Sequence, residues 1–422
     1  MPKRYRKVTY RLYPGREQVK GLWLMFHGHR DLYNSLIEQR RSAWLQQQRR
    51  HLSFTDQCAE ITRLRAEAPF WQKFNAQSMQ VTAKRVDLAF KAFFRRVRQG
   101  EKPGFPRFKS LSRFNGWGYK THGDGWRFTP DTDHRHRIRN GMLRISGIGE
   151  MRARGRMRTY GIPKTCEIVQ EGGRWYASIT LLCFPGRETT GQAAGLDWGV
   201  STFATVATTE GGVAQIQNPR LLRSAEGALV QAQQVLARKT RGSRNRNRAR
   251  RKVARLHRKV RNQRLDFLHQ ATAHLVRHFG FLATEELAVA NMTKSSRGTE
   301  EAPGTNVQQK AGLNKSILDT APGLFLSMLR YKAEEAGAEL VEVPTRSLKA
   351  TQRCARCWET TKKSLFQRIH HCAHCGFTLD RDWNAALVAL IYAMSGNGRE
   401  PAACVRLPSS GAGWHETPCR AA

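Results

Sequence analysis

Two patterns of apolar residues follow one another at the start of the chain. Apolar and polar residues alternate between 7 and 13, which predicts a strand that ends at Pro14. From residue 17 the apolar residues recur at helical spacing. A second amphipathic helix is predicted over 75–98, with basic residues on its outer face. We therefore expect a helical lobe over 16–102.

Strands dominate the region that follows a Gly- and Pro-rich break at 100–106. Short runs of β-branched and aromatic residues occur between 103 and 190, and the clearest lie at 143–148 and 175–183. We expect these strands to join residues 1–15 in an antiparallel, β-barrel-like module. The helical lobe would then be an insertion into that module.

Strands mixed with helices characterise the second half of the chain. Residues 193–208 predict a strand, a Gly turn and a second strand, and short apolar runs at 281–284 and 340–343 lie between helical stretches. This mixture is typical of an α/β layer fold, so the whole chain is expected to be a multi-domain α+β protein. A helical segment is predicted over about 224–279, and the Gly-, Pro- and Ser-rich tail at 397–422 is expected to be disordered.

The charge of the chain excludes an ordinary enzyme with balanced charge. Its 422 residues contain 72 Lys and Arg against 33 Asp and Glu, a net charge of +39, which calls for a polyanionic partner. A membrane is a poor candidate, because the apolar stretch at 385–394 is about half the length of a membrane span. The basic N-terminus is not followed by the apolar stretch of a signal peptide. We therefore expect the reducing environment of the cytosol.

A single basic segment concentrates much of this charge. Between 238 and 264 there are 14 Lys and Arg in 27 residues and no acid. A solvated charged face usually carries both signs, so the uniform sign favours contact with a nucleic-acid backbone. The residues expected to make it are Arg244, Arg246, Arg248, Arg250, Arg251, Lys252, Arg255, Arg258 and Lys259. Aromatic residues elsewhere are candidates either for stacking on bases or for the core, namely Trp71, Phe105, Phe108, Trp117, Tyr119 and Trp126.

Four of the nine cysteines form two CxxC pairs, Cys354 with Cys357 and Cys372 with Cys375, 14 residues apart. Two such knuckles complete a tetrahedral zinc site. Four thiolates leave no position open for water, so the zinc would be structural, and so small a ribbon needs the metal to fold. Redox cysteines or an iron–sulfur cluster are the alternatives. Nearby histidines are candidate substitute ligands or, preferably, surface residues, namely His370, His371 and His374.

Acidic residues next to apolar strands are unusual in so basic a chain. Asp197 ends one predicted strand, Glu285 and Glu286 end another, and Asp380 and Asp382 begin a helix. Three carboxylates from two strand ends and a helix start would suit two Mg²⁺ ions about 3.5–4 Å apart. For each acid alone, the alternative is a helix cap, a turn residue or a salt bridge, and for Asp380 the cap is the preferred interpretation because a helix follows.

The ordered motifs resemble the TnpB family, the OrfB proteins that insertion sequences encode as transposases and that are related to type V CRISPR effectors. The motifs that carry this resemblance are Gly195-Leu-Asp-Trp-Gly199, Thr284-Glu-Glu-Leu287, the two CxxC pairs and Asp380-Arg-Asp-Trp-Asn-Ala-Ala386. Family members usually have Gly at the position of Trp358, and Gly-Trp in place of Ala321-Pro322.

The resemblance implies a RuvC/RNase H-like nuclease domain with the catalytic acids Asp197, Glu285 and Asp382 as magnesium ligands. It also implies structural Zn²⁺, a guide RNA from the end of the element, and recognition of duplex DNA beside a short motif. The expected domains are a wedge module at 1–15 and 103–190, a recognition lobe at 16–102, a nuclease domain at 193–345 and 377–396, and an inserted zinc ribbon at 346–376.

Two other functions are compatible with parts of this pattern. One is a zinc-ribbon protein that binds nucleic acid and regulates transposition without cutting. The other is a strand-joining transposase, which would require a His-apolar-His motif. The two H-x-H runs, at 27–29 and 134–136, have no bulky apolar residue at their centre, so we favour RNA-guided cleavage by two-metal hydrolysis.

Overall fold

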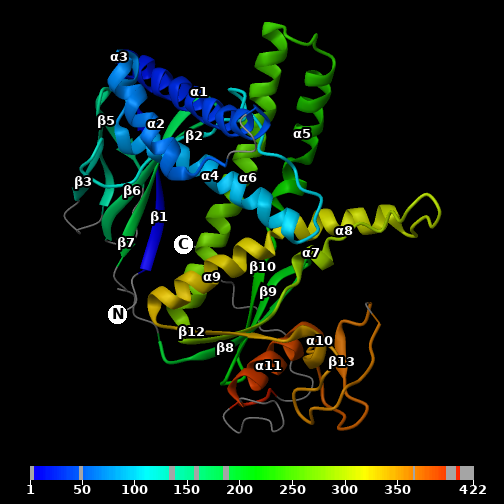
Figure 1. Ribbon diagram of the computed structural model, residues 1–422. Coiled ribbons are helices and arrows are strands. Elements are labelled where there is room, and N and C mark those ends of the chain that lie inside the picture. Colours follow the sequence, from blue (N-terminus) through cyan, green and yellow to red (C-terminus); the bar gives the residue numbers. More distant parts are fainter. Residues whose placement is uncertain are drawn as a thin grey trace. The chain divides into compact units, whose positions relative to one another are not determined.

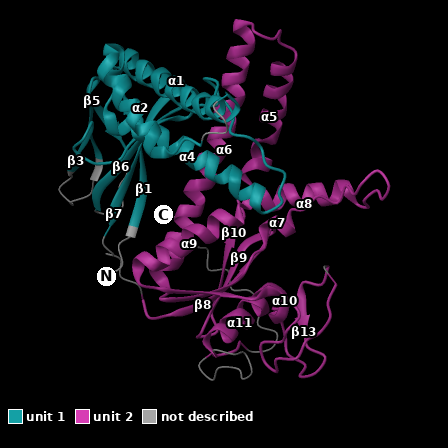
Figure 2. Ribbon diagram, in the orientation of Figure 1, with its two compact units in different colours: residues 1–184 teal, residues 185–422 magenta. Residues whose placement is uncertain are grey.

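A computed structural model describes residues 4–46, 51–132, 138–155, 161–183, 190–364, 366–395 and 405–408. The chain divides into two compact units, residues 1–184 and 185–422 (Figure 2). No helix in the described ranges is both long and apolar enough to cross a membrane.

The first unit is built on a seven-stranded antiparallel sheet (Figure 1). Its strand order is β2-β6-β7-β1-β5-β4-β3. The strands are β1 (Arg4–Tyr13), β2 (Gly116–Tyr119), β3 (Trp126–Thr132), β4 (Ile138–Ile145), β5 (Gly149–Arg154), β6 (Gly161–Glu171) and β7 (Arg174–Cys183). Among the described residues β2 and β3 are the edges and do not pair with each other, so the expected barrel-like module is an open sheet here.

Four helices lie between β1 and β2 in the sequence: α1 (Arg16–Gln46), α2 (Phe54–Glu67), α3 (Pro69–Gln72) and α4 (Ala76–Arg98). Aromatic side chains join them to one face of the sheet, where Trp23 meets Trp175 edge to face at 5.2 Å and His29 stacks on Trp117 at 5.7 Å. Apolar residues from helices and strands form one core cluster. The alternation seen in the sequence therefore buries Tyr10 and Leu12 under the helices.

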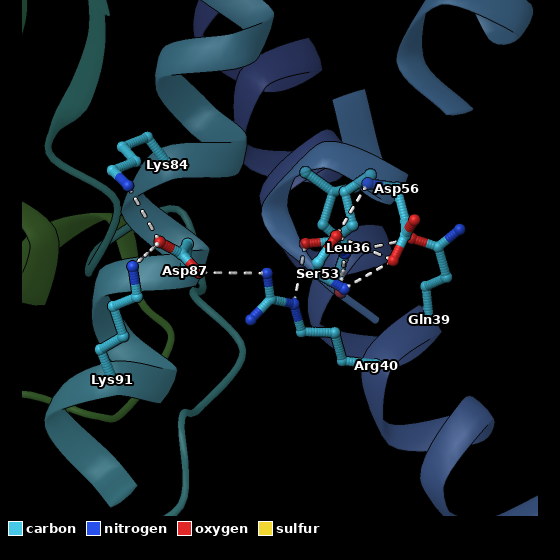
Figure 3. A network of polar contacts seen from close by, with 9 residues as sticks. Leu36, Gln39, Arg40, Ser53, Asp56, Lys84, Asp87 and Lys91 are labelled. Carbon is cyan, nitrogen blue, oxygen red and sulfur yellow. Dashed lines mark hydrogen bonds and ion pairs between the residues drawn. The ribbon is translucent and has the colours of Figure 1, made fainter. Parts of the chain in front are cut away.

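A buried polar network ties three of these helices together (Figure 3). Arg40 of α1 donates to Gln57 of α2 at 2.9 Å and lies 3.5 Å from Asp87 of α4. Burial alone would raise the pKa of Asp87, but hydrogen bonds from Lys91 and Lys84 hold it below its usual value. A buried charge is tolerated only when it is paired in this way.

The second unit contains a five-stranded mixed sheet with the order β10-β9-β8-β11-β12. Strands β8 (Ala193–Trp198), β9 (Thr202–Thr208) and β10 (Val213–Gln217) are antiparallel neighbours, whereas β11 (Phe281–Glu285) and β12 (Glu339–Val343) add in parallel. Parallel neighbours need crossover connections, and helices supply them.

Helices cover both faces of this sheet. On one face α6 (Arg244–His278) and α9 (Pro322–Ala336) pack on alternate residues of β8 and β9, including Leu196 and Val206. On the other face lies α11 (Arg381–Met394), which is buried along most of its length. The remaining helices are α5 (Leu221–Ala237), α7 (Val289–Met292), α8 (Val307–Thr320) and α10 (Thr345–Leu348). A small hairpin of β13 (Ile369–His371) and β14 (Thr378–Asp380) precedes α11.

Two expectations for this half need correction. The predicted helical segment over 224–279 is broken into α5 and α6, because Gly242 adopts a positive φ of 84° and Ser243 caps α6. The tail was expected to be disordered, but residues 405–408 pack on the sheet: Val405 is buried and the Arg406 amide donates to the Thr209 carbonyl at 2.7 Å. Residues 397–404 and 409–422 lie outside the described residues.

Candidate functional site

The strands bring Asp197 and Glu285 together. Strands β8 and β11 run in parallel with Leu196 opposite Thr284, so the next residue of each strand, the acid, lies at the same carboxyl end of the sheet. Side chains alternate along a strand, and Leu196 faces α6 and α9. Asp197 and Glu285 therefore face the side that α11 covers.

A glycine allows α11 to approach these strands closely. A Cβ atom on Gly195 would lie 1.9 Å from the carbonyl oxygen of Ala386 in α11. The helix begins five residues earlier at Arg381, where Asp380 caps it by accepting the amides of Asp382 and Trp383 at 2.9 and 3.0 Å. This confirms the cap reading for Asp380 and leaves Asp382 in the first turn.

Asp197 interacts electrostatically with both of the other candidate acids. Burial, followed by the negative charges of Asp382 and Glu285, raises the pKa of Asp197 well above its usual value. Burial raises the pKa of Glu285 to about 7. Glu286, the next residue, is exposed. Burial destabilises the charged form of these two carboxylates, and a bound cation would compensate for that cost.

The four cysteines of the ribbon form a much tighter group. Cys354 Sγ lies 3.7 Å from Cys375 Sγ, and Cys357 Sγ lies 3.5 Å from Cys372 Sγ. A tetrahedron with Zn–S bonds of about 2.3 Å has S···S edges of about 3.8 Å. Within the described ranges this is the only group of three or more His, Cys, Asp or Glu whose ligand atoms all lie within 4.8 Å of one another. The thiols therefore fit a zinc ion, whereas the carboxylates are spaced more widely.

The ribbon departs from expectation at two places. His370 was expected at the surface, but it is buried and its Nδ1 contacts the Lys363 ammonium group, while His371 and His374 are exposed. Trp358 adopts a positive φ of 67°, a backbone conformation that glycine reaches more easily than other residues. This conformation accounts for the Gly that TnpB family members usually have at this position. Arg353 compensates by donating to the Trp358 carbonyl at 2.7 Å and lying over its ring.

The basic candidates are carried by α6. Most of the nine side chains are exposed, whereas Arg246 and Arg258 are half-buried. Arg246 donates to the carbonyls of Leu236 and Lys239 at the end of α5, at 3.1 and 2.8 Å. Arg246 therefore stabilises the turn between α5 and α6. The exposed basic residues of α6 face solvent.

The aromatic candidates separate by burial. Trp117, Tyr119 and Trp126 are at most 3% exposed and belong to the core of the first unit, so they are not stacking platforms. Phe105 and Phe108 are almost half exposed.

Two polar residues of α11 that sequence reasoning passed over connect the acids to the ribbon. Arg381 donates to Asp382 Oδ1 at 3.2 Å and to the Gln367 carbonyl at 3.0 Å. Asn384 is fully buried and bonds to Arg353 and Ala355 of the first knuckle. In the sequence, Arg381 could have been noticed because it stands between Asp380 and Asp382 at the start of an apolar helix.

Comparison with known proteins agrees with this picture. A family model described as "Probable transposase" matches residues 169–296, and one described as "Cas12f1-like, TNB domain" matches residues 323–389. A protein of Streptomyces pristinaespiralis, named "Putative RNA-guided DNA endonuclease", is 30% identical over 392 residues, 90% of this chain and 87% of its own. A protein of Escherichia coli with the same description is 31% identical over 314 residues, 74% of this chain and 73% of its own.

Two solved structures share the fold. The Cas12f1 chain of a complex with sgRNA and target DNA matches with a TM-score of 0.56 and 11% identity, covering 92% of this chain and 98% of its own. The mini-RNA-guided endonuclease CRISPR-Cas phi3 matches with a TM-score of 0.52 and 8% identity, covering 96% and 94%. From the similarity that spans nine-tenths of the chain, the protein belongs to the OrfB family of transposon-encoded proteins, the TnpB-like family that its motifs resemble.

Proposed function

We propose that the protein is an RNA-guided DNA endonuclease of a transposable element. In this proposal Asp197, Glu285 and Asp382 are the catalytic acids of a RuvC/RNase H-like domain. The observation that carries the proposal is the convergence of these carboxylates at one edge of the mixed sheet, where burial disfavours the charged forms of Asp197 and Glu285. Family membership and the endonuclease names of the relatives support it.

The donor set suits magnesium. Mg²⁺ prefers oxygen ligands, and a spacing wider than one coordination sphere suits two ions about 3.5–4 Å apart. Bound there, the ions would supply an activated water for in-line attack on the phosphodiester and would stabilise the leaving 3′ oxygen. Asp197 interacts electrostatically with both of the other acids, so the three side chains together would hold the ions. Burial favours the protonated form of Glu285, and the carboxyl group must lose its proton to serve as a ligand.

The other parts of the chain would serve the guide RNA and the DNA. We assign Zn²⁺ to Cys354, Cys357, Cys372 and Cys375, where it holds the ribbon together. The exposed Arg and Lys residues of α6 would contact nucleic-acid backbone. A guide RNA from the end of the element would pair with a target strand beside a short motif. The proposed setting is the bacterial or archaeal cytoplasm, on DNA of the nucleoid.

The domain assignment of this proposal keeps the boundaries expected from the sequence. They are a wedge module at 1–15 and 103–190, a recognition lobe at 16–102, a nuclease domain at 193–345 and 377–396, and a zinc ribbon at 346–376. The mixed sheet flanked by helices supports the nuclease domain, and the β13–β14 hairpin before α11 supports the inserted ribbon.

The test begins with the RNA. The protein is expressed together with the DNA that flanks its gene, and the RNA that co-purifies is sequenced. We expect one discrete species from the end of the element, and Mg²⁺-dependent cleavage of a DNA library that carries its target. Heterogeneous RNA that salt removes would contradict guidance and favour the non-cleaving regulator.

Substitutions then test the acids. Asp197→Ala should retain the RNA and lose cleavage. Glu286→Gln is the matched control, because this exposed neighbour of Glu285 lies outside the cluster, and it should cleave normally. Full cleavage by the Asp197→Ala protein would overturn the assignment of the site.

A further inference from the structure

Arg381 is the first residue of α11 and stands between two acids. Its Nε donates to Asp382 Oδ1 at 3.2 Å, and its Nη1 donates to the carbonyl oxygen of Gln367 at 3.0 Å. Its main-chain amide donates to the carbonyl of Arg368 at 2.7 Å. The Arg381 side chain is only 16% exposed. One side chain therefore joins a candidate metal ligand to the loop of the ribbon that leads into β13.

A second contact fixes the same turn of the helix from the other half of the ribbon. Asn384 is fully buried; its Nδ2 donates to the Arg353 carbonyl at 2.7 Å, and its Oδ1 accepts the Ala355 amide at 3.1 Å. Both partners flank Cys354, a cysteine of the first knuckle. The first turn of α11 is thus held by the ribbon at two points, and Asp382 lies between them.

The positive charge of Arg381 lies beside carboxylates that are proposed to bind a cation. A cation beside carboxylates that bind Mg²⁺ competes with the metal, and this electrostatic effect alone would weaken metal binding. A hydrogen bond at Oδ1 still leaves acceptor capacity on a carboxylate. Groups that orient a ligand in this way raise metal affinity.

We propose that Arg381 is a positioning residue that aims the Asp382 carboxylate and links its orientation to the folded zinc ribbon. The inference rests on the proposed function, since it takes Asp382 as a metal ligand. It assigns the ribbon a task beyond holding itself together, because the ribbon supplies the carbonyl that anchors the guanidinium.

The experiment measures metal binding directly. Mn²⁺, a spectroscopic substitute for Mg²⁺, is titrated into the purified full-length RNA complex, and free Mn²⁺ is followed by electron paramagnetic resonance. Outer contacts of this kind typically contribute about 10–100-fold in metal affinity. We expect Arg381→Gln to weaken Mn²⁺ binding at this site by at least about tenfold, with unchanged zinc content and thermal unfolding. A purely electrostatic role predicts the opposite sign, tighter binding.

A second variant separates position from charge. Arg381→Lys keeps the charge but lacks the fork that reaches both Asp382 and Gln367. Positioning predicts that it also binds Mn²⁺ weakly, whereas a charge effect predicts wild-type affinity. Arg368→Gln is the matched control, because its exposed side chain makes no hydrogen bond or ion pair in the described part of the ribbon, and it should bind normally.

The outcomes also distinguish this inference from the proposed function. Asp197→Ala should lose Mn²⁺ binding if the acids hold metal at all. If that variant loses binding while both Arg381 variants bind as tightly as wild type, the site stands and the positioning role is overturned. Loss of zinc from the Arg381 variants would also overturn it, because the residue would then serve to hold the ribbon. If wild type and Asp197→Ala bind Mn²⁺ equally, the proposed function itself fails.

Discussion

Replacing Glu285 by Gln should stabilise the metal-free protein, although Glu285 is a proposed catalytic acid. Gln has nearly the shape of protonated Glu and carries no charge. Burial raises the pKa of Glu285 from 4.5 to about 7. The folded state therefore binds more protons than the unfolded chain between these two values, and its free energy of unfolding falls as pH rises through this window. Below pH 4.5 both states hold the proton and the penalty vanishes.

The magnitude follows from the two pKa values. Each unit of pKa corresponds to about 1.36 kcal/mol, so the difference between 4.5 and about 7 amounts to at most roughly 3 kcal/mol above pH 7. At pH 5 the same linkage leaves less than about 1 kcal/mol. A unit of this size shifts its unfolding temperature by about 2–4 °C per kcal/mol, so the variant should unfold up to roughly 6–12 °C higher at pH 8.

The assay is differential scanning calorimetry of the full chain at pH 8 and pH 5, without added divalent cation. Glu286→Gln is the control at the adjacent, exposed position and should lie within about 0.5 kcal/mol of wild type. Adding Mg²⁺ should stabilise wild type, by about 2.7 kcal/mol at a hundred times its dissociation constant. It should have a much smaller effect on Glu285→Gln, which has lost a ligand.

Two results would refute this reasoning. If Glu285→Gln is no more stable than wild type at pH 8, the carboxylate is not penalised by burial. If the gain is equal at both pH values, it comes from packing and not from charge.

Three further predictions follow from the structure. Gly195→Ala should destabilise the protein by about 3 kcal/mol or more, because the new Cβ would lie 1.9 Å from the Ala386 carbonyl oxygen; unchanged thermal unfolding would contradict this close approach. Cys372→Ser should lower the zinc content and increase hydrogen exchange in the first turn of α11, which the ribbon holds; normal protection there would show that the ribbon does not support the helix. Arg251→Gln should reduce the salt dependence of RNA binding by about one phosphate contact, while Arg246→Gln should instead loosen the hairpin of α5 and α6; equal slopes for wild type and Arg251→Gln would exclude that contact.

Local patterns in the sequence were enough for many of the elements. The alternation at residues 7–13 corresponds to β1, and the helical spacing after residue 75 corresponds to α4. Spacing of this kind reflects the local geometry of a strand or helix, so it can be recognised in the sequence without knowledge of the fold. The break between α5 and α6 was missed, because the left-handed Gly242 sits inside a run of basic residues that otherwise favours a helix.

Long-range packing decided what local patterns left open. Burial placed Trp117 and Trp126 in the core, whereas the sequence allowed stacking on bases. The choice between Glu285 and Glu286 rested on resemblance, and the strand now separates them: Glu285 faces the side that α11 covers, while Glu286 is exposed. Packing also fixed residues 405–408 against the sheet, which composition alone did not indicate.

The sequence by itself determined the charge that calls for a polyanion, the four cysteines at the spacing of a zinc site, and the acids at the ends of apolar runs. Only the tertiary structure decided which acids meet and what holds them. The parallel register of β8 and β11 sets two acids side by side, and the close approach at Gly195 brings α11 and Asp382 to them. Residues almost two hundred positions apart form this cluster, and their proximity depends on the shape of the packed sheet, which no local pattern encodes.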